Sequence, residues 1–323
     1  MTQTNIGDVI ISTVLLDRLL STYPDAVVDV VAGGRSTDLF SAMPNLGELI
    51  PIVKKKHHMH YVDLWKKLVK YKYDIIVDLR GTGLSYFLRG KKKIRFTSKN
   101  KDMHKATQMA NLWPMDKSLT QRVWVDDTTK QKIAQEVKDL NAEVLIGIGP
   151  TANWIGKTWP QRYFALVANK LIKMPGFENA KFVVFGAAHE RKGVADFIDH
   201  LPENRRIDLV GKTSLTEAYA WMTHLTGFLG NDSGLSHLAA AADIPTVTLF
   251  GPTYEHLYAP VARRGHTIVA PARSVVNLES EAPKRLITDI KPHDVLHEIT
   301  RLIETLRQEE IEIETEIEGQ KSA

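Results

Sequence analysis

The residues best suited to chemistry lie in short segments that precede helical patterns. The first segment is Asn5-Ile6-Gly7-Asp8-Val9. Glycine allows a tight turn from strand to helix, and an aspartate at a helix start accepts hydrogen bonds from backbone N–H groups. Asp8 is therefore either a plain helix N-cap or a carboxylate that faces a cleft, because ligands of open α/β sheets bind at the carboxyl ends of the strands.

The second segment, residues 149–160, follows an apolar run and holds Lys157 together with small and hydroxyl residues such as Thr151. Its Gly-Lys-Thr sequence resembles the end of a Walker A loop, but Thr151 stands where that template needs its first glycine. The second Gly-Lys-Thr, at 211–213, has Arg206 at the same position. We therefore exclude P-loop chemistry. The segment suits either a diphosphate or an ordinary turn with a solvent-facing lysine.

The third segment contains Asp232, Ser233, Gly234 and His237, and it joins a buried apolar run to a helix of small residues. The first turn of such a helix exposes N–H groups, and the helix dipole favours an anion there. Asp232 suits ribose hydroxyls or the orientation of the turn. His237 lies one helical turn after Ser233 on the same face, so we interpret it as functional, with a purely structural histidine as the alternative.

The sequence lacks the residues or motifs that several common kinds of metal, catalytic and nucleotide site require. The sequence has no cysteine, which excludes disulfides and cysteine-ligated metals. It has no Asp-x-Asp motif, no Gly-x-Ser-x-Gly elbow and no Gly-x-Gly-x-x-Gly fingerprint. The histidines at 57, 58 and 60 do not have zinc-site spacing and lie in a lysine run. We therefore predict no metal site.

Positive charge is concentrated in one part of the chain. The net charge is +4, yet residues 50–105 hold 16 Lys and Arg against 4 Asp and Glu, and they include Lys91, Lys92 and Lys93. This stretch is either a solvated basic face or a surface for an anionic glycolipid or membrane. Nucleic acid is the least favoured partner of this stretch, because no aromatic residues alternate with the lysines as they do in RNA-binding motifs.

Short apolar runs alternate with helical patterns along the whole chain, which is typical of an α/β protein with parallel sheets. The expected strands are 26–32, 73–78, 144–148, 181–185, 227–230 and 246–250. The expected helices are 8–22, 62–71, 128–140, 161–173, 190–200, 215–224, 233–242 and 292–306. Residues 1–4 supply only the last piece of the strand that must precede the Asp8 turn, so the first strand is expected to be truncated.

No apolar run approaches the ~20 residues that span a bilayer, and the N-terminus has no secretory pattern, so the cytoplasm is the expected location. Residues 308–318 alternate Glu with Ile and Thr. They form either a frayed helix end or a disordered acidic tail, and we take 308–323 as disordered.

Together, the order and spacing of these segments resemble glycosyltransferase family 9, the ADP-heptose:lipopolysaccharide heptosyltransferases, over about residues 4–307. The carrying motifs are Asn-Ile-Gly-Asp-Val, Gly-Lys-Thr-Trp-Pro, and Asn-Asp-Ser-Gly-Leu-Ser-His-Leu followed by Phe-Gly-Pro-Thr. The resemblance implies a GT-B fold, in which two Rossmann-like domains face a cleft. It also implies transfer with inversion, without a metal or other cofactor.

The resemblance divides the chain into an acceptor-binding domain, residues 1–143, and a nucleotide-sugar domain, residues 144–290. A helix at 291–307 is expected to cross back to the first domain. The implied partners are a nucleotide sugar, with ADP-heptose expected, and a lipopolysaccharide precursor, with peripheral contact at the inner face of the inner membrane.

The resemblance also assigns roles to single residues. Asp8 matches the general base, and Lys157 matches a lysine that contacts the donor phosphates. The donor-binding turn corresponds to Asp232, Ser233, Gly234 and His237, where the family often has Thr in place of Ser233. Glu190 falls near a glutamate that contacts the nucleoside. Thr213 falls where a nucleotide-contacting residue, often Met, lies.

Two other functions remain open. One is a GT-B transferase or epimerase that uses another nucleotide sugar. The other is a non-catalytic protein that binds a nucleotide sugar.

Overall fold

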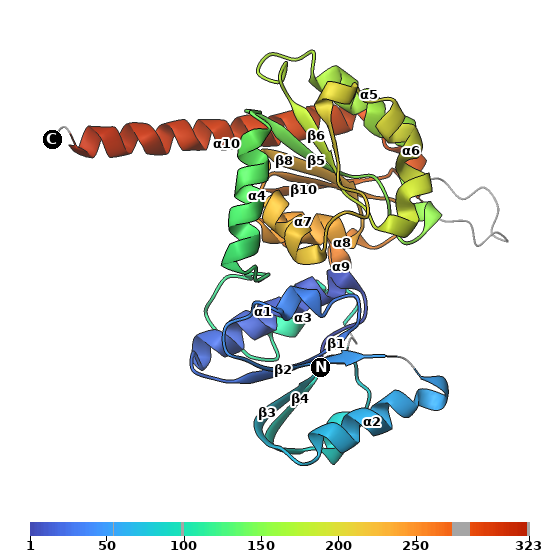
Figure 1. Cartoon of the computed structure of the whole chain (residues 1–323), viewed down its shortest axis with the longest axis vertical. Coiled ribbons are helices and arrows are strands. Elements are labelled where there is room, and N and C mark those ends of the chain that lie inside the picture. The colour runs from blue at the N-terminus through green and yellow to red at the C-terminus, as the bar shows by residue number, and fades with distance from the viewer. Residues whose placement is uncertain (54, 98–99, 273–284, 322–323) are drawn as a thin grey trace.

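The computed structural model describes residues 1–53, 55–97, 100–272 and 285–321. Two α/β parts lie one above the other along the long axis of the molecule (Figure 1). The C-terminal part contains a six-stranded parallel sheet in the order β10-β9-β8-β5-β6-β7. Its strands are β5 (Leu145–Gly149), β6 (Lys181–Val184), β7 (Arg206–Asp208), β8 (Gly227–Asn231), β9 (Thr246–Phe250) and β10 (Gly265–Val269). This is the classical Rossmann order, and the strand order reverses between β5 and β8.

Helices cover both faces of this sheet. One face packs against α5 (Gln161–Leu171), α6 (Arg191–Asp199) and α10 (Pro292–Lys321), which bury Phe164, Phe197 and Val295. The other face packs against α4 (Asp127–Asp139), α7 (Leu215–Met222) and α8 (Gly234–Ala241). The short helix α9 (Glu255–Tyr258) follows β9. The strands are buried on both faces, which explains why they form continuous apolar runs in the sequence.

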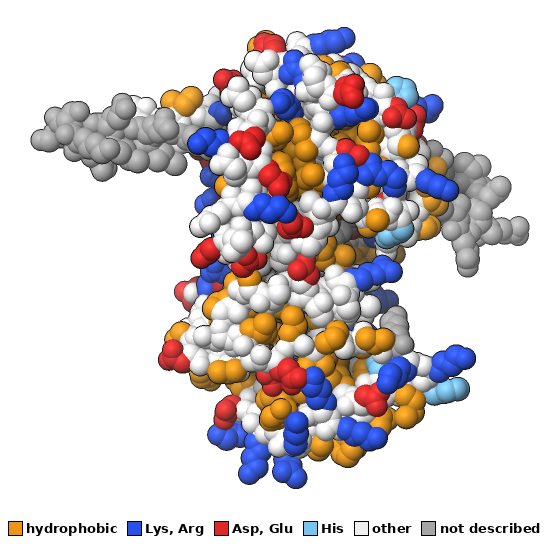
Figure 2. All heavy atoms as spheres, in the orientation of Figure 1, with side chains coloured by type: hydrophobic (Ala, Val, Ile, Leu, Met, Phe, Trp, Pro, Cys, Tyr) orange, Lys and Arg blue, Asp and Glu red, His pale blue; other side chains and the backbone are white. Residues whose placement is uncertain are grey.

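The N-terminal part contains two parallel strand pairs. β1 (Val28–Gly33) pairs with β2 (Leu46–Ile52), and β3 (Lys72–Asp78) pairs with β4 (Arg89–Arg95). The helices are α1 (Ile6–Thr22), α2 (Met59–Leu68) and α3 (Lys105–Ala110), and the short 3₁₀ helix η3 is Leu84–Phe87. α1 and α3 share one apolar cluster, whereas α2 and η3 share another. Lys and Arg side chains gather around the lower end of the molecule, which this part forms (Figure 2).

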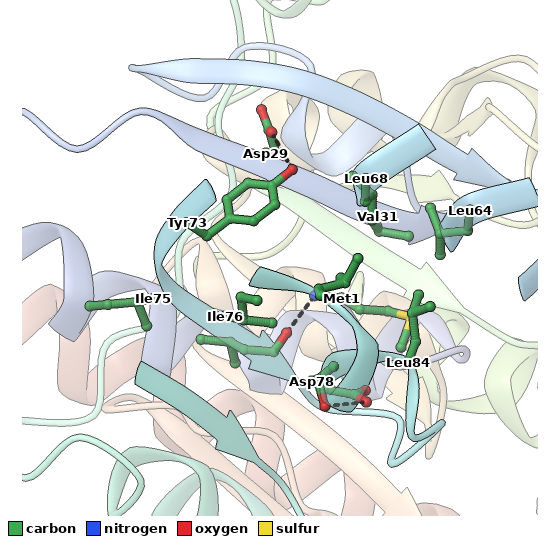
Figure 3. Close-up of a pocket in the computed structure, with 13 residues that line it drawn as sticks. Met1, Asp29, Val31, Leu64, Leu68, Tyr73, Ile75, Ile76, Asp78 and Leu84 are labelled. Atoms are coloured by element: carbon green, nitrogen blue, oxygen red, sulfur yellow. Dashed lines mark hydrogen bonds between the residues drawn. The ribbon is translucent and has the colours of Figure 1, made fainter. Parts of the chain in front are cut away.

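The first residues of the chain join the two strand pairs. The Thr2 N–H donates to the carbonyl of Val31 in β1 (2.9 Å), and the Met1 amino group donates to the carbonyl of Val77 in β3 (2.7 Å). Beside Met1, a cavity of about 80 Å³ lies between β1 and β3 and is lined by apolar side chains that include Val31 and Ile76 (Figure 3). Residues 1 and 2 therefore lie between β1 and β3, although the structure assigns no strand to them.

Three expectations about the elements differ from the structure. Helix α10 packs on α5 and on β8, β9 and β10, so the prediction that it crosses back to the N-terminal part is wrong. Its long apolar face matches the C-terminal sheet, and Val295, Ile299 and Ile303 are buried there. Helix α4, expected in the first domain, packs on α7 of the second.

The acidic tail also differs from its prediction. Residues 308–321 continue helix α10 rather than forming a disordered segment, and the helix extends well beyond the sheet it covers (Figure 1). Glutamate and glutamine are good helix formers, and no proline interrupts this run. Within the described residues, no helix is both long and apolar enough to cross a membrane.

Candidate functional site

Asp8 lies in the first turn of α1, at the end of the helix that meets the C-terminal part. The residue at the N-cap is Asn5, and its side-chain Nδ2 donates to Asp8 Oδ2 at 2.9 Å. The interpretation of Asp8 as a plain N-cap is therefore wrong. Burial raises the pKa of Asp8 above its ordinary value, while the Asn5 hydrogen bond and the positive charges of Lys157 and Lys105 oppose that rise. Asp8 is thus a partly desolvated carboxylate that faces charges from both parts of the protein.

Lys157 is held close to the sheet rather than pointing into solvent. It ends the 3₁₀ helix η4 (Ile155–Lys157), and its Nζ lies 2.6 Å from Asp232 Oδ2. Its side chain is only 19% exposed, so the alternative of a solvent-facing lysine is wrong. Buried Trp159 anchors the loop, because its backbone N–H donates to Asn231 Oδ1 at 3.0 Å. Thr151 is buried in the same loop, just after β5.

The turn between β8 and α8 has buried polar groups that lack protein partners. Asp232 is buried, and its Oδ2 also accepts a hydrogen bond from Thr253 Oγ1 at 2.7 Å. Ser233 is at the N-cap of α8. Within the described part of the chain, Ser233 Oγ and His237 Nδ1 are buried without a hydrogen-bond partner. Buried polar atoms are nearly always satisfied, so these two are suited to a ligand at this helix end.

The amino ends of α1 and α8 touch each other. A Cβ atom on Gly7 would lie 2.6 Å from His237 Cδ2, and one on Gly234 would lie 2.8 Å from Ile6 Cγ2. These two glycines therefore permit the close approach of the two helices. Burial lowers the pKa of His237 to about 4, so this ring is neutral near pH 7. Two helix N-termini and Lys157 converge here, which is an arrangement that favours an anion.

The sheet order explains why these segments meet. The loop that holds Lys157 follows β5, and the Asp232 turn follows β8. β5 and β8 are the strands between which the order reverses, and ligands of open α/β sheets bind at that position. The structure thus brings together Asp8, Lys157, Asp232, Ser233, Gly234 and His237, and it places Thr151 in the loop that leads from β5 to Lys157.

Glu190 and Thr213 lie further along the same edge of the sheet. Glu190 follows β6, and its Oε2 accepts a hydrogen bond from the backbone N–H of Ala187 at 2.7 Å. One carboxylate oxygen therefore already caps the local turn. Thr213 follows β7 and immediately precedes Ser214, the N-cap of α7. β6 and β7 lie one and two strands from β5, so Glu190 and Thr213 extend the candidate site along the carboxyl edge of the sheet, away from β8.

The three consecutive lysines do not form one cluster. Lys91 Nζ forms an exposed ion pair with Asp74 at 2.7 Å. Lys92 Nζ lies 3.7 Å from the ring centroid of Trp113, in the α1–α3 cluster. Lys93 Nζ donates to the Tyr86 carbonyl at 3.1 Å, beside η3. Successive strand residues point to opposite faces of a sheet, so one surface does not use all three.

Sequence reasoning missed two residues near Asp8. Asn5 was treated only as part of a motif, yet it is the hydrogen-bond partner of Asp8. Lys105 was counted among surface lysines, but it is buried at the start of α3, where burial lowers its pKa and the charge of Asp8 opposes that shift. Lys105 Nζ also lies 5.7 Å from the ring centroid of Tyr258, in the C-terminal part. The sequence held no signal that separated Lys105 from its exposed neighbours.

In the portion of the chain that the structure describes, no group of three His, Cys, Asp or Glu side chains is arranged to hold a metal ion.

Comparison with known proteins identifies the family. The family model described as glycosyltransferase family 9 (heptosyltransferase) matches residues 91–285, which is more than half of the chain. The chain belongs to glycosyltransferase family 9. It is therefore an enzyme of the glycosyltransferase class.

Relatives of this family 9 glycosyltransferase match it over nearly their full length. Lipooligosaccharide heptosyltransferase 2 of Haemophilus influenzae is 24% identical, with 92% of this chain and 96% of the relative covered. Lipopolysaccharide heptosyltransferase 2 of Escherichia coli is also 24% identical, with the same coverage.

Solved structures agree on the fold of this family 9 glycosyltransferase. The E. coli ADP-heptose lps heptosyltransferase II superposes with a TM-score of 0.73 at 22% identity, covering 95% of this chain and 98% of that one. A family 9 glycosyl transferase from Veillonella parvula gives 0.76 at 22% identity, covering 93% and 94%. The predicted GT-B fold is confirmed.

Proposed function

We propose that this enzyme transfers a heptose from ADP-heptose to a lipopolysaccharide core or lipid A precursor, with inversion and without a metal. The observation that carries the proposal is the meeting of Asp8 with Lys157 and the Asp232–His237 turn at the switch point of the sheet. Solved relatives described as heptosyltransferases with ADP or with an ADP-heptose analogue support the choice of donor.

The chemistry follows from the roles of these groups. Asp8 accepts the proton of an acceptor hydroxyl while the hydroxyl oxygen attacks the anomeric carbon. The bond from that carbon to the phosphate oxygen breaks on the opposite side, and ADP leaves with the bonding electrons. Lys157 and the N–H groups at the start of α8 stabilise the developing negative charge. Ser233 Oγ and His237 Nδ1 provide further hydrogen bonds to the donor.

The remaining candidate residues are proposed to contact the donor, and the acceptor is proposed to come from a membrane. Thr151 and Asp232 contact the donor near its phosphates and ribose, while Glu190 and Thr213 lie where they would contact the nucleoside. The acceptor binds on the N-terminal part, which carries the excess of Lys and Arg. Such an acceptor is anionic and membrane-borne, so the proposed location is the cytoplasm at the inner face of the inner membrane.

A transfer assay tests this function. The purified chain is incubated with a heptose-free lipid A precursor and ADP-heptose, ADP-glucose or a UDP-sugar, and products are weighed by mass spectrometry. We expect heptose addition with ADP-heptose at the highest kcat/KM and a product of inverted configuration. Isomerised donor without acceptor would indicate an epimerase. Binding of ADP-heptose without turnover would indicate a non-catalytic protein.

Transfer is expected to persist in excess EDTA. The charge of the leaving diphosphate is neutralised by Lys157 and two helix N-termini, so a bridging cation is not required. The measurement is the initial rate before and after dialysis against EDTA. Loss of activity that added Mg²⁺ or Mn²⁺ restores would contradict the metal-free mechanism.

A further inference from the structure

The outer side of α2 carries an exposed apolar stripe that the proposed chemistry does not use. Leu64 and Leu68 face the core, whereas Met59, Val62 and Trp65 are spaced three residues apart and are all exposed. Residues at this spacing are neighbours on a helix surface. The stripe therefore presents apolar side chains to solvent along most of α2.

The stripe continues onto η3. Trp65 Nε1 donates to the Phe87 carbonyl at 3.4 Å, which places the two elements side by side. Phe87 and Tyr86 are 73% and 61% exposed, although both are large aromatic residues. Exposed apolar patches of this kind usually mark an interaction site. We call Met59, Val62, Trp65, Tyr86 and Phe87 the α2–η3 surface.

Cations surround the α2–η3 surface. Lys93 Nζ donates to the Tyr86 carbonyl, and the Arg95 guanidinium lies 3.7 Å from the Tyr86 ring centroid. Lys66 is exposed on α2, one helical turn from Val62. Residues 55–97 hold 12 Lys and Arg against 3 Asp, and of these acids Asp63 is paired with Lys55 and Asp74 with Lys91.

We propose that the α2–η3 surface docks this protein on an anionic lipid bilayer. Tryptophan, tyrosine and phenylalanine enter the boundary between head groups and acyl chains, and flanking lysines and arginines pair with lipid phosphates. Charge complementarity favours the bilayer over an acidic protein, because the same surface offers both apolar anchors and flexible lysine side chains that reach the head groups.

The position of the surface fits a membrane-borne substrate. Helix α2 starts after the carboxyl end of β2 and returns to the start of β3, so Met59 lies toward the carboxyl edge of the N-terminal strands, which is where ligands of parallel sheets bind. A bilayer seated along α2 therefore places lipid-anchored molecules beside that edge. Docking goes beyond the proposed transfer reaction, and it is testable without any sugar.

Binding to vesicles tests the docking. Phosphatidylcholine vesicles with and without phosphatidylglycerol are floated with the whole protein and with Met59→Ser/Phe87→Ser and Lys66→Gln/Lys93→Gln variants. We expect binding that requires phosphatidylglycerol. The serine pair should weaken it about tenfold or more, and the glutamine pair should weaken it about fivefold or more for each cation.

Matched controls lie on the other part of the molecule. Ile311→Ser removes a side chain that is 62% exposed, and Lys130→Gln/Lys138→Gln removes two exposed charges from α4. Both controls should bind vesicles like the unchanged protein. Because every substituted residue is exposed, circular dichroism and melting temperature should not change. ADP binding by calorimetry should not change either.

The outcomes separate docking from transfer. Variants that bind vesicles like the unchanged protein, or equal binding to neutral vesicles, would overturn the docking proposal. So would a dimer in sedimentation that the serine pair converts to monomers, because a second copy would then cover the surface. If vesicle binding behaves as expected but no sugar is transferred, the docking stands and the proposed function fails.

Discussion

The Asp8→Asn enzyme is expected to transfer sugar at least about 100-fold more slowly than the unchanged enzyme. The amide keeps the size of the carboxylate and its place in the first turn of α1, but it does not accept the proton of the acceptor hydroxyl. Because Asp8 acts on the acceptor side, ADP binding measured by calorimetry should stay within about twofold. The measurement is kcat with saturating donor and acceptor.

The matched control is Asp25→Asn, an exposed carboxylate in the same part of the protein. It should leave kcat unchanged. The pH dependence gives an independent check, because burial raises the pKa of Asp8. The base works only when deprotonated, so kcat/KM should fall as pH drops through this raised pKa, at a higher pH than for an ordinary aspartate. Near-normal turnover in the Asp8→Asn enzyme would rule out Asp8 as the base.

Lys157→Ala is expected to weaken ADP binding about 10- to 100-fold, the usual loss for a hydrogen bond to a charged group. Binding of adenosine, which has no phosphate, should change much less. Calorimetry with both ligands measures the difference. Equal losses for ADP and adenosine would contradict a phosphate contact.

The ion pair between Lys157 and Asp232 means that Lys157→Ala should change protein stability as well as ADP affinity. When Lys157 is removed, the buried Asp232 carboxylate loses its ion pair and keeps the hydrogen bond from Thr253 Oγ1. A buried charge without its ion-pair partner destabilises the fold, so the melting temperature should fall. The double variant Lys157→Ala/Asp232→Ala removes the uncompensated charge. It should recover stability without recovering ADP affinity. Recovery of both would mean that Lys157 only neutralises Asp232.

Much of the fold could be predicted because buried parallel strands form continuous apolar runs. Thr246–Phe250 was expected with its observed bounds, and the other five expected strands differ by one or two residues at their ends. The missed strands lack that signal. β2 contains a glycine and a proline, β4 reads Arg-Gly-Lys-Lys-Lys-Ile-Arg, β7 has three residues, and β10 begins Gly-His-Thr. Their place in the sheets depends on neighbouring strands rather than on their own composition.

The candidate site was predictable as a set of loops but not as a set of contacts. Parallel strands bring their carboxyl ends to one edge, so the loops with Lys157 and Asp232 had to be neighbours if β5 and β8 pair. The ion pair between them and the Asn5 bond to Asp8 depend on side-chain orientation within the loops, and the burial of Lys105 depends on how the N-terminal and C-terminal parts pack. The prediction for α10 was wrong because the periodicity of its apolar residues identifies a buried face but not the surface that covers it.

The contact between Gly7 and His237 has a consequence for where the proposed reaction can take place. It joins α1, which carries the proposed base, to α8, which follows the proposed phosphate-binding turn, and these two elements belong to different parts of the molecule. Each part alone therefore lacks half of the proposed site. Under the proposed mechanism, a donor on the C-terminal part reacts only where α1 lies against α8, and Gly7 and Gly234 leave the space for that approach.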